Sequence, residues 1–260
     1  VKLLDDLDRP DTDRELTVRI LNARLFATFS DIDRYPAVAV EAEGLPALTG
    51  ATPAECQLLA HLARIRLGAG GTAAEVVELA ERAAPPAALE DADAGPGWFV
   101  AVIIALTAAD RYDPAEHLAE RAIDRAKASG ALSHYVWATT HRARIAWLRG
   151  KLDEAEGLAR SALEAGESVR EWWRLSPVMV LIETLLDQGR VEDAASAWTA
   201  TGLGETVPRQ RPLTPLLQAR ARLRLEQGDP QAALGDLSEI TERLGSLASE
   251  NFNGLVPRLR

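Results

Sequence analysis

The feature that most constrains this chain is a turn that recurs every 39 or 40 residues. One complete unit, RIAWLRGKLDEAEGLARSALE from Arg144 to Glu164, has a helical run, a turn at Gly150 and a second helical run. The apolar residues of the second run recur at three- and four-residue steps and therefore share one helix face. They are Leu152, Ala155, Leu158, Ala159 and Ala162. A single helix pair could not bury this face, so the pattern predicts neighbouring copies.

The copies are present along the chain. The turn recurs at Asp31, Gly71, Asp110, Gly150, Gly189 and Gly228, with gaps of 40, 39, 40, 39 and 39 residues. A small or modestly apolar residue follows each turn by five positions: Pro36, Val76, Ala115, Ala155, Ala194 and Ala233. No segment alternates apolar and polar residues for long, so we expect no sheet. The series predicts an all-α fold, a right-handed superhelical solenoid of about six helix pairs and about twelve main helices.

Composition narrows the function and the compartment. The formal net charge is −10, from 29 basic and 39 acidic residues, which does not suit direct binding of nucleic acid. Cys56 is the only cysteine, so no intrachain disulfide can form and a cytoplasmic location is expected. The longest apolar run, Trp98 to Ala109, is too short to span a bilayer, so we expect no membrane contact.

Two local patterns concern helix ends. Thr52, Pro53 and Glu55 form a capping-box sequence with proline at the first helical position, which predicts a helix start. The following helix should end at the glycine-rich cluster 68–71. This cluster lacks the Lys-Ser/Thr of a phosphate-binding loop and follows no strand, so we interpret it as a turn. The helix before Gly189 could start near Ser168, or near Ser176 with its following proline; the sequence does not choose between these.

No pattern of catalytic or metal-binding residues is visible. The four histidines, His61, His117, His134 and His141, form no His-Glu-x-x-His motif, and there is no Cys-x-x-Cys pair. Carboxylate pairs such as Asp153 and Glu154 fall in first helical turns, where they favour the helix dipole. We therefore expect no enzyme activity, no metal and no cofactor in this chain.

The repeat resembles a known family. Gly150, Leu152, Ala155, Ala162 and Leu163 occupy the turn and packing positions of tetratricopeptide-like repeats, although that repeat usually has about 34 residues. Nearly the whole chain is similar to the sensor arm of the large ATP-binding regulators of the LuxR family. The resembling stretches are LAHLARIRLGAGGTAAEVVELAERA, ALTAADRYDPAEHLAERAIDRAKASG, ARIAWLRGKLDEAEGLARSALE and ARARLRLEQGDPQAALGDL, with the closing NGLVPRLR.

Members of that family carry an N-terminal P-loop ATPase, a helical-repeat arm and a C-terminal LuxR-type helix-turn-helix. This chain has neither a Walker motif nor a recognisable helix-turn-helix. The resemblance therefore implies that residues 1–260 are a single helical-repeat domain, excised from the middle of a longer regulator. ATP would then bind only in a flanking domain.

The resemblance also implies a groove. In tetratricopeptide-like superhelices the first helix of each pair lines the concave side, and a residue six before the turn faces it. These residues change from apolar to charged along the chain: Leu25, Ile65, Ile104, Arg144, Glu183 and Arg222.

Trp137 and His141 precede Arg144 by seven and three residues, so the three share one helix face. Together they could stack on and hydrogen-bond a polar ligand. In the alternative interpretation, Trp137 belongs to the core and the other two side chains are simply solvated.

The candidate groove residues are therefore Trp137, His141, Arg144, Glu183 and Arg222. Our first hypothesis is that the chain is the sensor domain of an ATP-dependent LuxR-type transcription regulator. It would bind a small-molecule effector or a protein in its groove and act on the flanking ATPase and DNA-binding domains. The alternative is a stand-alone tetratricopeptide-like scaffold that binds a peptide or protein.

Overall fold

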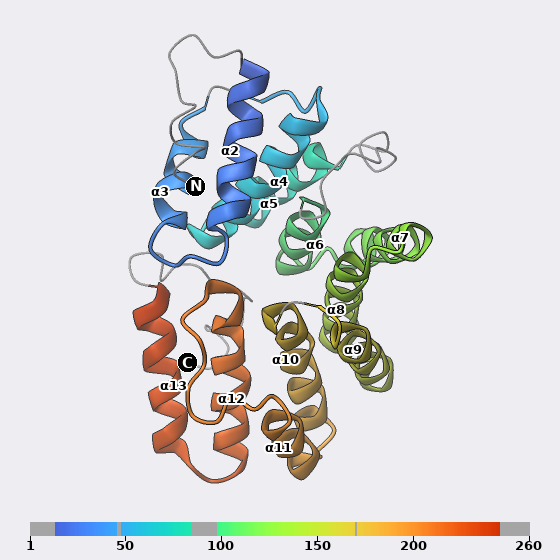
Figure 1. The fold of residues 1–260 in the computed structure, drawn as a ribbon, viewed down its shortest axis with the longest axis vertical. Helices are drawn as coiled ribbons and strands as arrows, with labels where there is room; N and C mark the ends of the chain where they lie inside the picture. Colours follow the sequence, from blue (N-terminus) through green and yellow to red (C-terminus); the bar gives the residue numbers. More distant parts are fainter. Residues whose placement is uncertain (1–13, 46–47, 85–97, 170, 245–260) are drawn as a thin grey trace. The chain divides into compact units, whose positions relative to one another are not determined.

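The computed structural model describes residues 14–45, 48–84, 98–169 and 171–244, with the side chains of 171–174 and 244 excluded. The described residues form twelve α-helices, one short 3-10 turn and no strand (Figure 1). Sequential helices pack against each other, as in an α-solenoid. This confirms the all-α prediction. The closing NGLVPRLR lies outside the described residues.

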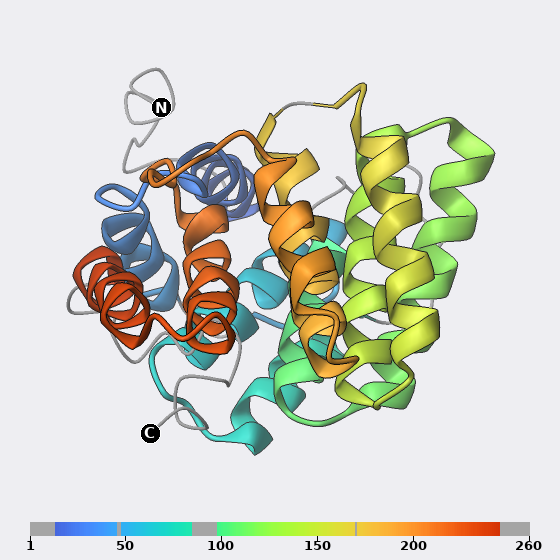
Figure 2. The same ribbon diagram turned by 90° about the horizontal axis from the view of Figure 1, so that it is seen from below.

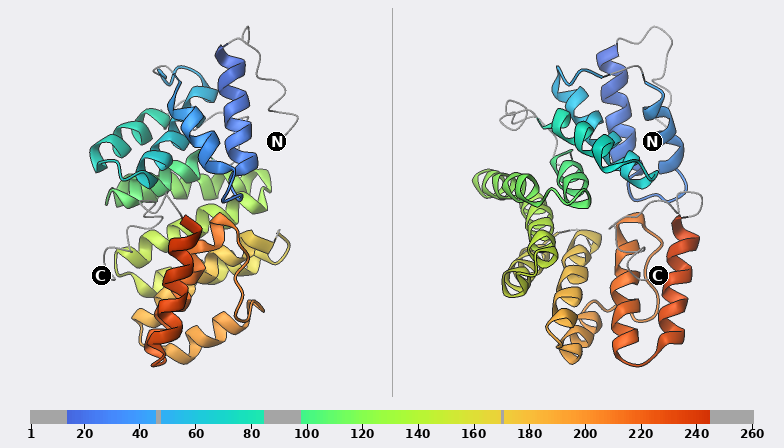
Figure 3. Two further views of the ribbon diagram at one scale, coloured as in Figure 1. Left: turned by 90° about the vertical axis from the view of Figure 1, so that its left-hand side faces the viewer. Right: turned by 180° about the vertical axis from the view of Figure 1, so that it is seen from behind.

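The helices divide into two compact units, with the boundary between Arg111 and Tyr112. The first unit contains α2 (Arg14–Thr28), α3 (Tyr35–Glu43), α4 (Pro53–Gly68), α5 (Ala73–Ala83) and α6 (Trp98–Ala108). Within it α4 contacts all four other helices, and Figure 3 shows the same helices from two further sides. The prediction that residues 1–260 form one domain stays a prediction.

The second unit carries the candidate site. It contains α7 (Tyr112–Ser129), α8 (Leu132–Leu148), α9 (Leu152–Gly166), α10 (Glu171–Asp187), α11 (Val191–Thr199), η2 (Arg211–Leu213), α12 (Thr214–Glu226) and α13 (Pro230–Leu244). Figure 2 shows α7, α8 and α9, coloured green to yellow, as long helices lying side by side. The first helices of successive pairs also meet, because α10 packs against both α8 and α12. A buried cluster surrounds α10, where Ile182 and Leu185 are fully enclosed.

The turns between paired helices lie close to their predicted positions. At Gly150 the backbone is left-handed, with φ of +73°, which glycine adopts without strain. The N–H of Lys151 then donates to the carbonyl of Ala146 at 2.9 Å and closes the end of α8. An equivalent bond from the residue after the turn closes four other first helices; its donors are Gly71, Arg111, Arg190 and Asp229.

Two turns depart from the prediction in detail. The left-handed residue after α4 is Gly70, one position before the predicted Gly71. The first connection is longer, because α2 ends at Thr28 and α3 begins at Tyr35. There the side chain of Asp31 accepts hydrogen bonds from the backbone N–H groups of residues 33 and 34, at 3.0 and 3.1 Å.

The predicted capping box at α4 forms only in part. The Thr52 hydroxyl accepts from the N–H of Glu55 at 3.2 Å, and proline occupies the first turn, as expected. The Glu55 carboxylate instead accepts from the N–H groups of Thr49, Gly50 and Ala51. The Thr49 hydroxyl also donates to this carboxylate, at 2.6 Å. This bond, followed by the three from N–H groups, outweighs the effect of burial and lowers the pKa of Glu55.

The sequence left two possible starts for the helix before Gly189, near Ser168 or near Ser176. This helix, α10, begins at Glu171, close to the first of them. Pro177 therefore lies inside the helix rather than at its start. Because proline has no N–H, the helix lacks one backbone hydrogen bond at this point.

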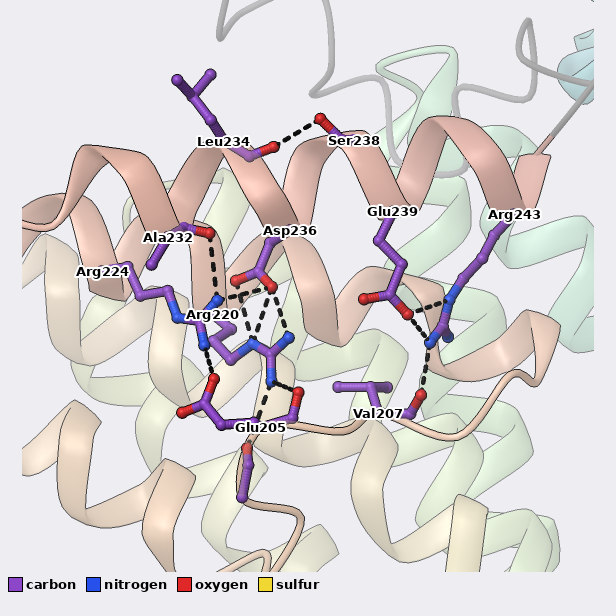
Figure 4. Close-up of polar contacts among 11 residues, drawn as sticks. Glu205, Val207, Arg220, Arg224, Ala232, Leu234, Asp236, Ser238, Glu239 and Arg243 are labelled. Carbon is purple, nitrogen blue, oxygen red and sulfur yellow. Dashed lines mark hydrogen bonds and ion pairs between the residues drawn. The ribbon is translucent and has the colours of Figure 1, made fainter.

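Arginines attach the connection between α11 and η2 to the last helix pair (Figure 4). Arg220 forms a buried ion pair with Asp236, with nitrogen–oxygen distances of 2.5 to 3.1 Å, and donates to the Glu205 carbonyl at 2.8 Å. Arg243 donates to the carbonyls of Val207 and Pro208, at 2.5 and 2.8 Å. The connection is therefore held by side chains of two helices rather than by backbone pairing.

Candidate functional site

The structure brings the three charged residues of the predicted row onto three adjacent helices. Arg144 lies on α8, Glu183 on α10 and Arg222 on α12, and we call these residues the charged row. A guanidinium nitrogen of Arg222 lies 2.6 Å from a carboxylate oxygen of Glu183, which is only 4% exposed. Arg144 is close enough to Glu183 for each to shift the pKa of the other. The predicted register therefore places these three residues together.

Two further residues extend the charged row. The second terminal nitrogen of Arg222 pairs with Asp187, one turn beyond Glu183 on α10. Asp187 also accepts a hydrogen bond from the indole N–H of Trp147 on α8, at 2.6 Å. Sequence reasoning missed both residues, although the signal was present. Asp187 lies four residues after Glu183 and Trp147 three after Arg144, so each shares a face with a row member.

The pKa values show that these side chains are not freely solvated. Burial raises the pKa of Glu183, and the neighbouring Arg222 offsets this only in part. For Arg222, burial opposes the charge, but Asp187 and Glu183 outweigh it and raise its pKa. The same ion pair thus stabilises a cation that remains partly exposed and a carboxylate that is almost fully enclosed. Burying a paired charge in this way contributes little net stability. Packing alone therefore does not explain why charged residues occupy these positions.

His141 and Arg144 are each partly exposed but strongly desolvated. Burial, assisted by the nearby positive charge of Arg144, lowers the pKa of His141 to about 3. Burial also lowers the pKa of Arg144 to about 10, against the opposing effects of Glu183 and Tyr112. At neutral pH the site therefore holds a neutral imidazole beside a guanidinium cation. Both side chains are partly exposed, so they are neither freely solvated nor fully enclosed.

Trp137 differs from the other candidates. Its side chain is 8% exposed and belongs to the buried residues of α8. This matches the alternative in which Trp137 is core, and it leaves little indole surface for a ligand. We therefore retain His141 and Arg144, but not Trp137, as candidate ligand contacts.

The equivalent positions of the first unit are apolar. Leu25 on α2 is fully buried and Ile65 on α4 is 6% exposed, whereas Ile104 on α6 is partly exposed. A helix of this kind can therefore place an aliphatic side chain at this position. The charges of the second unit are not a requirement of helix packing.

The arrangement presents several groups that can bind a polar ligand. It offers guanidinium donors, carboxylate acceptors and a neutral imidazole on three packed helices. Within the described ranges, no three His, Cys, Asp or Glu side chains are placed to hold a metal ion. None of the helices described is long and apolar enough to cross a membrane.

Comparisons with known proteins place the chain in no family. No protein-family model matches it. No curated protein is recognisably similar in sequence. The similarity to the LuxR-family sensor arm thus stays a prediction from the residues themselves.

Proposed function

We propose that this chain is the regulatory arm of an ATP-dependent LuxR-type transcription regulator. In this proposal the helix pairs continue as a right-handed superhelix with a 39–40-residue period, and the charged row lines its groove. An effector or a protein partner binds there. The arm itself is cytoplasmic and is not an enzyme. It needs no cofactor, because ATP binds in a flanking domain.

The observation that carries the binding role is the charged row itself. Arg144 and His141 are desolvated but still reachable from solvent, and Glu183 and Arg222 form an ion pair beside them. Strongly perturbed ionisable groups cluster at functional sites more often than elsewhere. Leu25 and Ile65 show that the same repeat position can be apolar, so charge is better explained by a ligand than by folding.

Regulation requires that the ligand distinguish two states of the full-length protein. A ligand shifts an equilibrium only by the difference between its affinities for the two states. We therefore expect the flanking ATPase domain to change affinity for ATP when the groove is occupied. Reciprocally, ATP should change the affinity of the groove for its ligand by the same factor.

The binding role can be tested without knowing the natural ligand. Peptides selected by display against the full 260-residue chain serve as probes, and their affinities are compared for wild type and Arg144→Gln. We expect the variant to lose about tenfold or more, because a desolvated charge contact is worth roughly 1.4 kcal/mol or more. The matched control is Arg209→Gln, since Arg209 is an exposed arginine outside the charged row. Equal affinity of both variants and wild type would exclude the charged row as the site.

The stand-alone scaffold remains the second candidate, because this sequence contains only helical repeats and no nucleotide-binding motif. The gene around the coding segment distinguishes the two. A P-loop upstream and a helix-turn-helix downstream, both in the same reading frame, are expected for the regulator. Stop codons directly flanking the segment would exclude the regulator and favour the stand-alone scaffold.

A further inference from the structure

A cavity of about 620 Å³ lies between α9, α10 and α11. Its lining contains no member of the charged row, so it is a separate feature of the second unit. Pockets of roughly 300–1,000 Å³ are typical of sites for small organic ligands. The volume is therefore sufficient for a ligand rather than only for a few water molecules.

The inner wall of this cavity is apolar. Leu175, Val178 and Leu181 recur at three-residue steps along α10 and line it, with Leu163 of α9 and Ala197 of α11 on either side. The three α10 residues are only 2 to 5% exposed and form the base of the cavity, so the apolar surface open to a ligand comes mainly from the more exposed Leu163, Ala197 and Ala200. Such a wall favours a ligand that buries hydrocarbon or aromatic surface.

The outer edge of the cavity is acidic. Glu164, Glu167 and Asp193 line it, and Arg160 is the single lining cation among the residues described. Arg160 is paired with Glu156 at 2.8 Å, and Asp193 with Arg190 at 2.7 Å, so these charges are already compensated. Glu164 and Glu167 are exposed and have no ion pair or hydrogen bond with any side chain the structure describes. Among the side chains described at the entrance, the uncompensated charge is therefore negative.

We propose that this cavity binds a hydrophobic organic cation. The apolar wall takes up the body of the ligand, and the carboxylates of Glu164 and Glu167 attract its positive charge at the entrance. A hydrophobic anion of the same shape would meet like charge and be rejected. This site is additional to the proposed groove and does not depend on it.

Tetraphenylphosphonium and tetraphenylborate are suitable probes, because the two ions have nearly the same shape and opposite charge. Isothermal titration calorimetry of the full chain should show saturable binding of tetraphenylphosphonium with a stoichiometry near one. Tetraphenylborate should bind at least about tenfold more weakly, which corresponds to roughly 1.4 kcal/mol. Equal binding of the two ions, or no binding of either, would overturn the proposal.

The whole chain is acidic, so the location of binding needs its own test. Ser196→Trp places a large side chain in the cavity, because exposed Ser196 of α11 lines it. Thr199→Trp is the matched control. Thr199 is an exposed hydroxyl residue of the same helix that does not line the cavity, and both hydroxyls donate to the carbonyl four residues earlier at 2.9 Å. Affinity for tetraphenylphosphonium should fall about tenfold or more in Ser196→Trp only. Unchanged affinity in Ser196→Trp would place the cation elsewhere.

A second pair of variants tests the charge at the entrance. Glu164→Gln with Glu167→Gln removes two charges from the cavity, whereas Asp124→Asn with Glu192→Gln removes two exposed charges that do not line it. The net charge of the chain is the same in both double variants. We expect about a threefold to tenfold weaker affinity in the first only, as for partly solvated charge pairs. An equal effect in both would show non-specific attraction and contradict the proposal.

Discussion

At the scale of single residues, Glu183 and His141 are the groups whose ionisation the fold affects most clearly. Glu183 is nearly enclosed, and its pKa is raised because burial outweighs the nearby Arg222. His141 is held neutral by burial, with Arg144 beside it. Both residues therefore link the proposed site to the pH dependence of stability, and each can be tested by one substitution.

Arg222→Leu should destabilise the fold, because it leaves the Glu183 carboxylate buried without its cation. We expect a loss of about 2–3 kcal/mol at pH 8. A buried carboxyl group destabilises the fold only while it is ionised. The loss of stability should therefore become smaller as the pH falls and Glu183 gains a proton. Urea unfolding at pH 8 and pH 5 measures this. The double variant Glu183→Leu with Arg222→Leu should lose less than Arg222→Leu; a larger, additive loss would show that the pair is not coupled.

His141→Gln should make the chain less sensitive to acid. The folded pKa of about 3 lies below the ordinary value of 6.5, so the unfolded chain takes up a proton that the folded chain excludes. Stability from this group is complete above pH 6.5 and falls by about 1.4 kcal/mol per pH unit between there and pH 3. Unfolding free energies at pH 7, 6 and 5 should decline less steeply in the variant. An identical decline would mean that His141 takes up its proton in the folded state.

At the scale of helices and turns, the backbone conformation of a glycine decides what a side chain would do there. Gly150 joins α8 to α9 with φ of +73°, whereas Gly157 lies in the middle of α9 and is exposed. A Cβ atom added at either position would meet no atom within 4 Å. The two sites therefore differ in backbone conformation rather than in available space.

The two alanine substitutions should have opposite signs. Gly157→Ala should stabilise the chain by about 0.5–1 kcal/mol, because glycine inside a helix loses more backbone entropy on folding. Gly150→Ala should destabilise it by about 1–2 kcal/mol, because an L-residue is strained at that φ. Denaturant midpoints of the two variants are the measurement. The same sign in both would contradict the assignment of the turn.

Arg220→Met should weaken the attachment of the connection between α11 and η2. It removes one of the two arginine partners of buried Asp236, which keeps Arg224 at 2.9 Å, and the bond to the Glu205 carbonyl, so we expect a loss of about 2–3 kcal/mol. Backbone hydrogen exchange of residues 203–208 should accelerate as well. The control is Arg209→Met, because Arg209 is an exposed arginine in the same connection. This substitution should change neither the stability nor the exchange rate. Slow exchange retained in Arg220→Met would mean that another contact holds this segment.

Local patterns predicted most of these elements, and tertiary contacts explain the exceptions. The turns at Gly150, Gly189 and Gly228 follow from glycine and helical periodicity alone. The capping box at α4 forms only in part because Glu55 reaches back to the N–H groups before the helix, a choice that the four-residue motif does not contain. The candidate site also combines features that local patterns predict with features that tertiary contacts decide.

The charged row followed from register, because its members hold the same place in successive units. The cavity beside α10 was not predicted, since its lining comes from separate helices whose spacing is set by packing. The depth of His141 and Arg144 was missed for the same reason, because burial depends on neighbouring helices rather than on the residue type.

At the scale of the whole molecule, the proposal assigns binding to this chain and nucleotide chemistry to a flanking domain. The isolated chain should neither hydrolyse ATP nor bind duplex DNA specifically. It has no P-loop lysine, and its net charge of −10 repels phosphate. Phosphate release and a gel-shift titration measure the two activities. Turnover that survives repeated purification would contradict this assignment.

The central claim is that a partner binds along α8, α10 and α12. The most direct test uses a display-selected peptide that carries a benzophenone group, photo-crosslinked to the full chain and mapped by mass spectrometry. Crosslinks within these three first helices, near Arg144, Glu183 and Arg222, are the predicted result. Crosslinks confined to the second helices α9, α11 and α13 would contradict the proposed site.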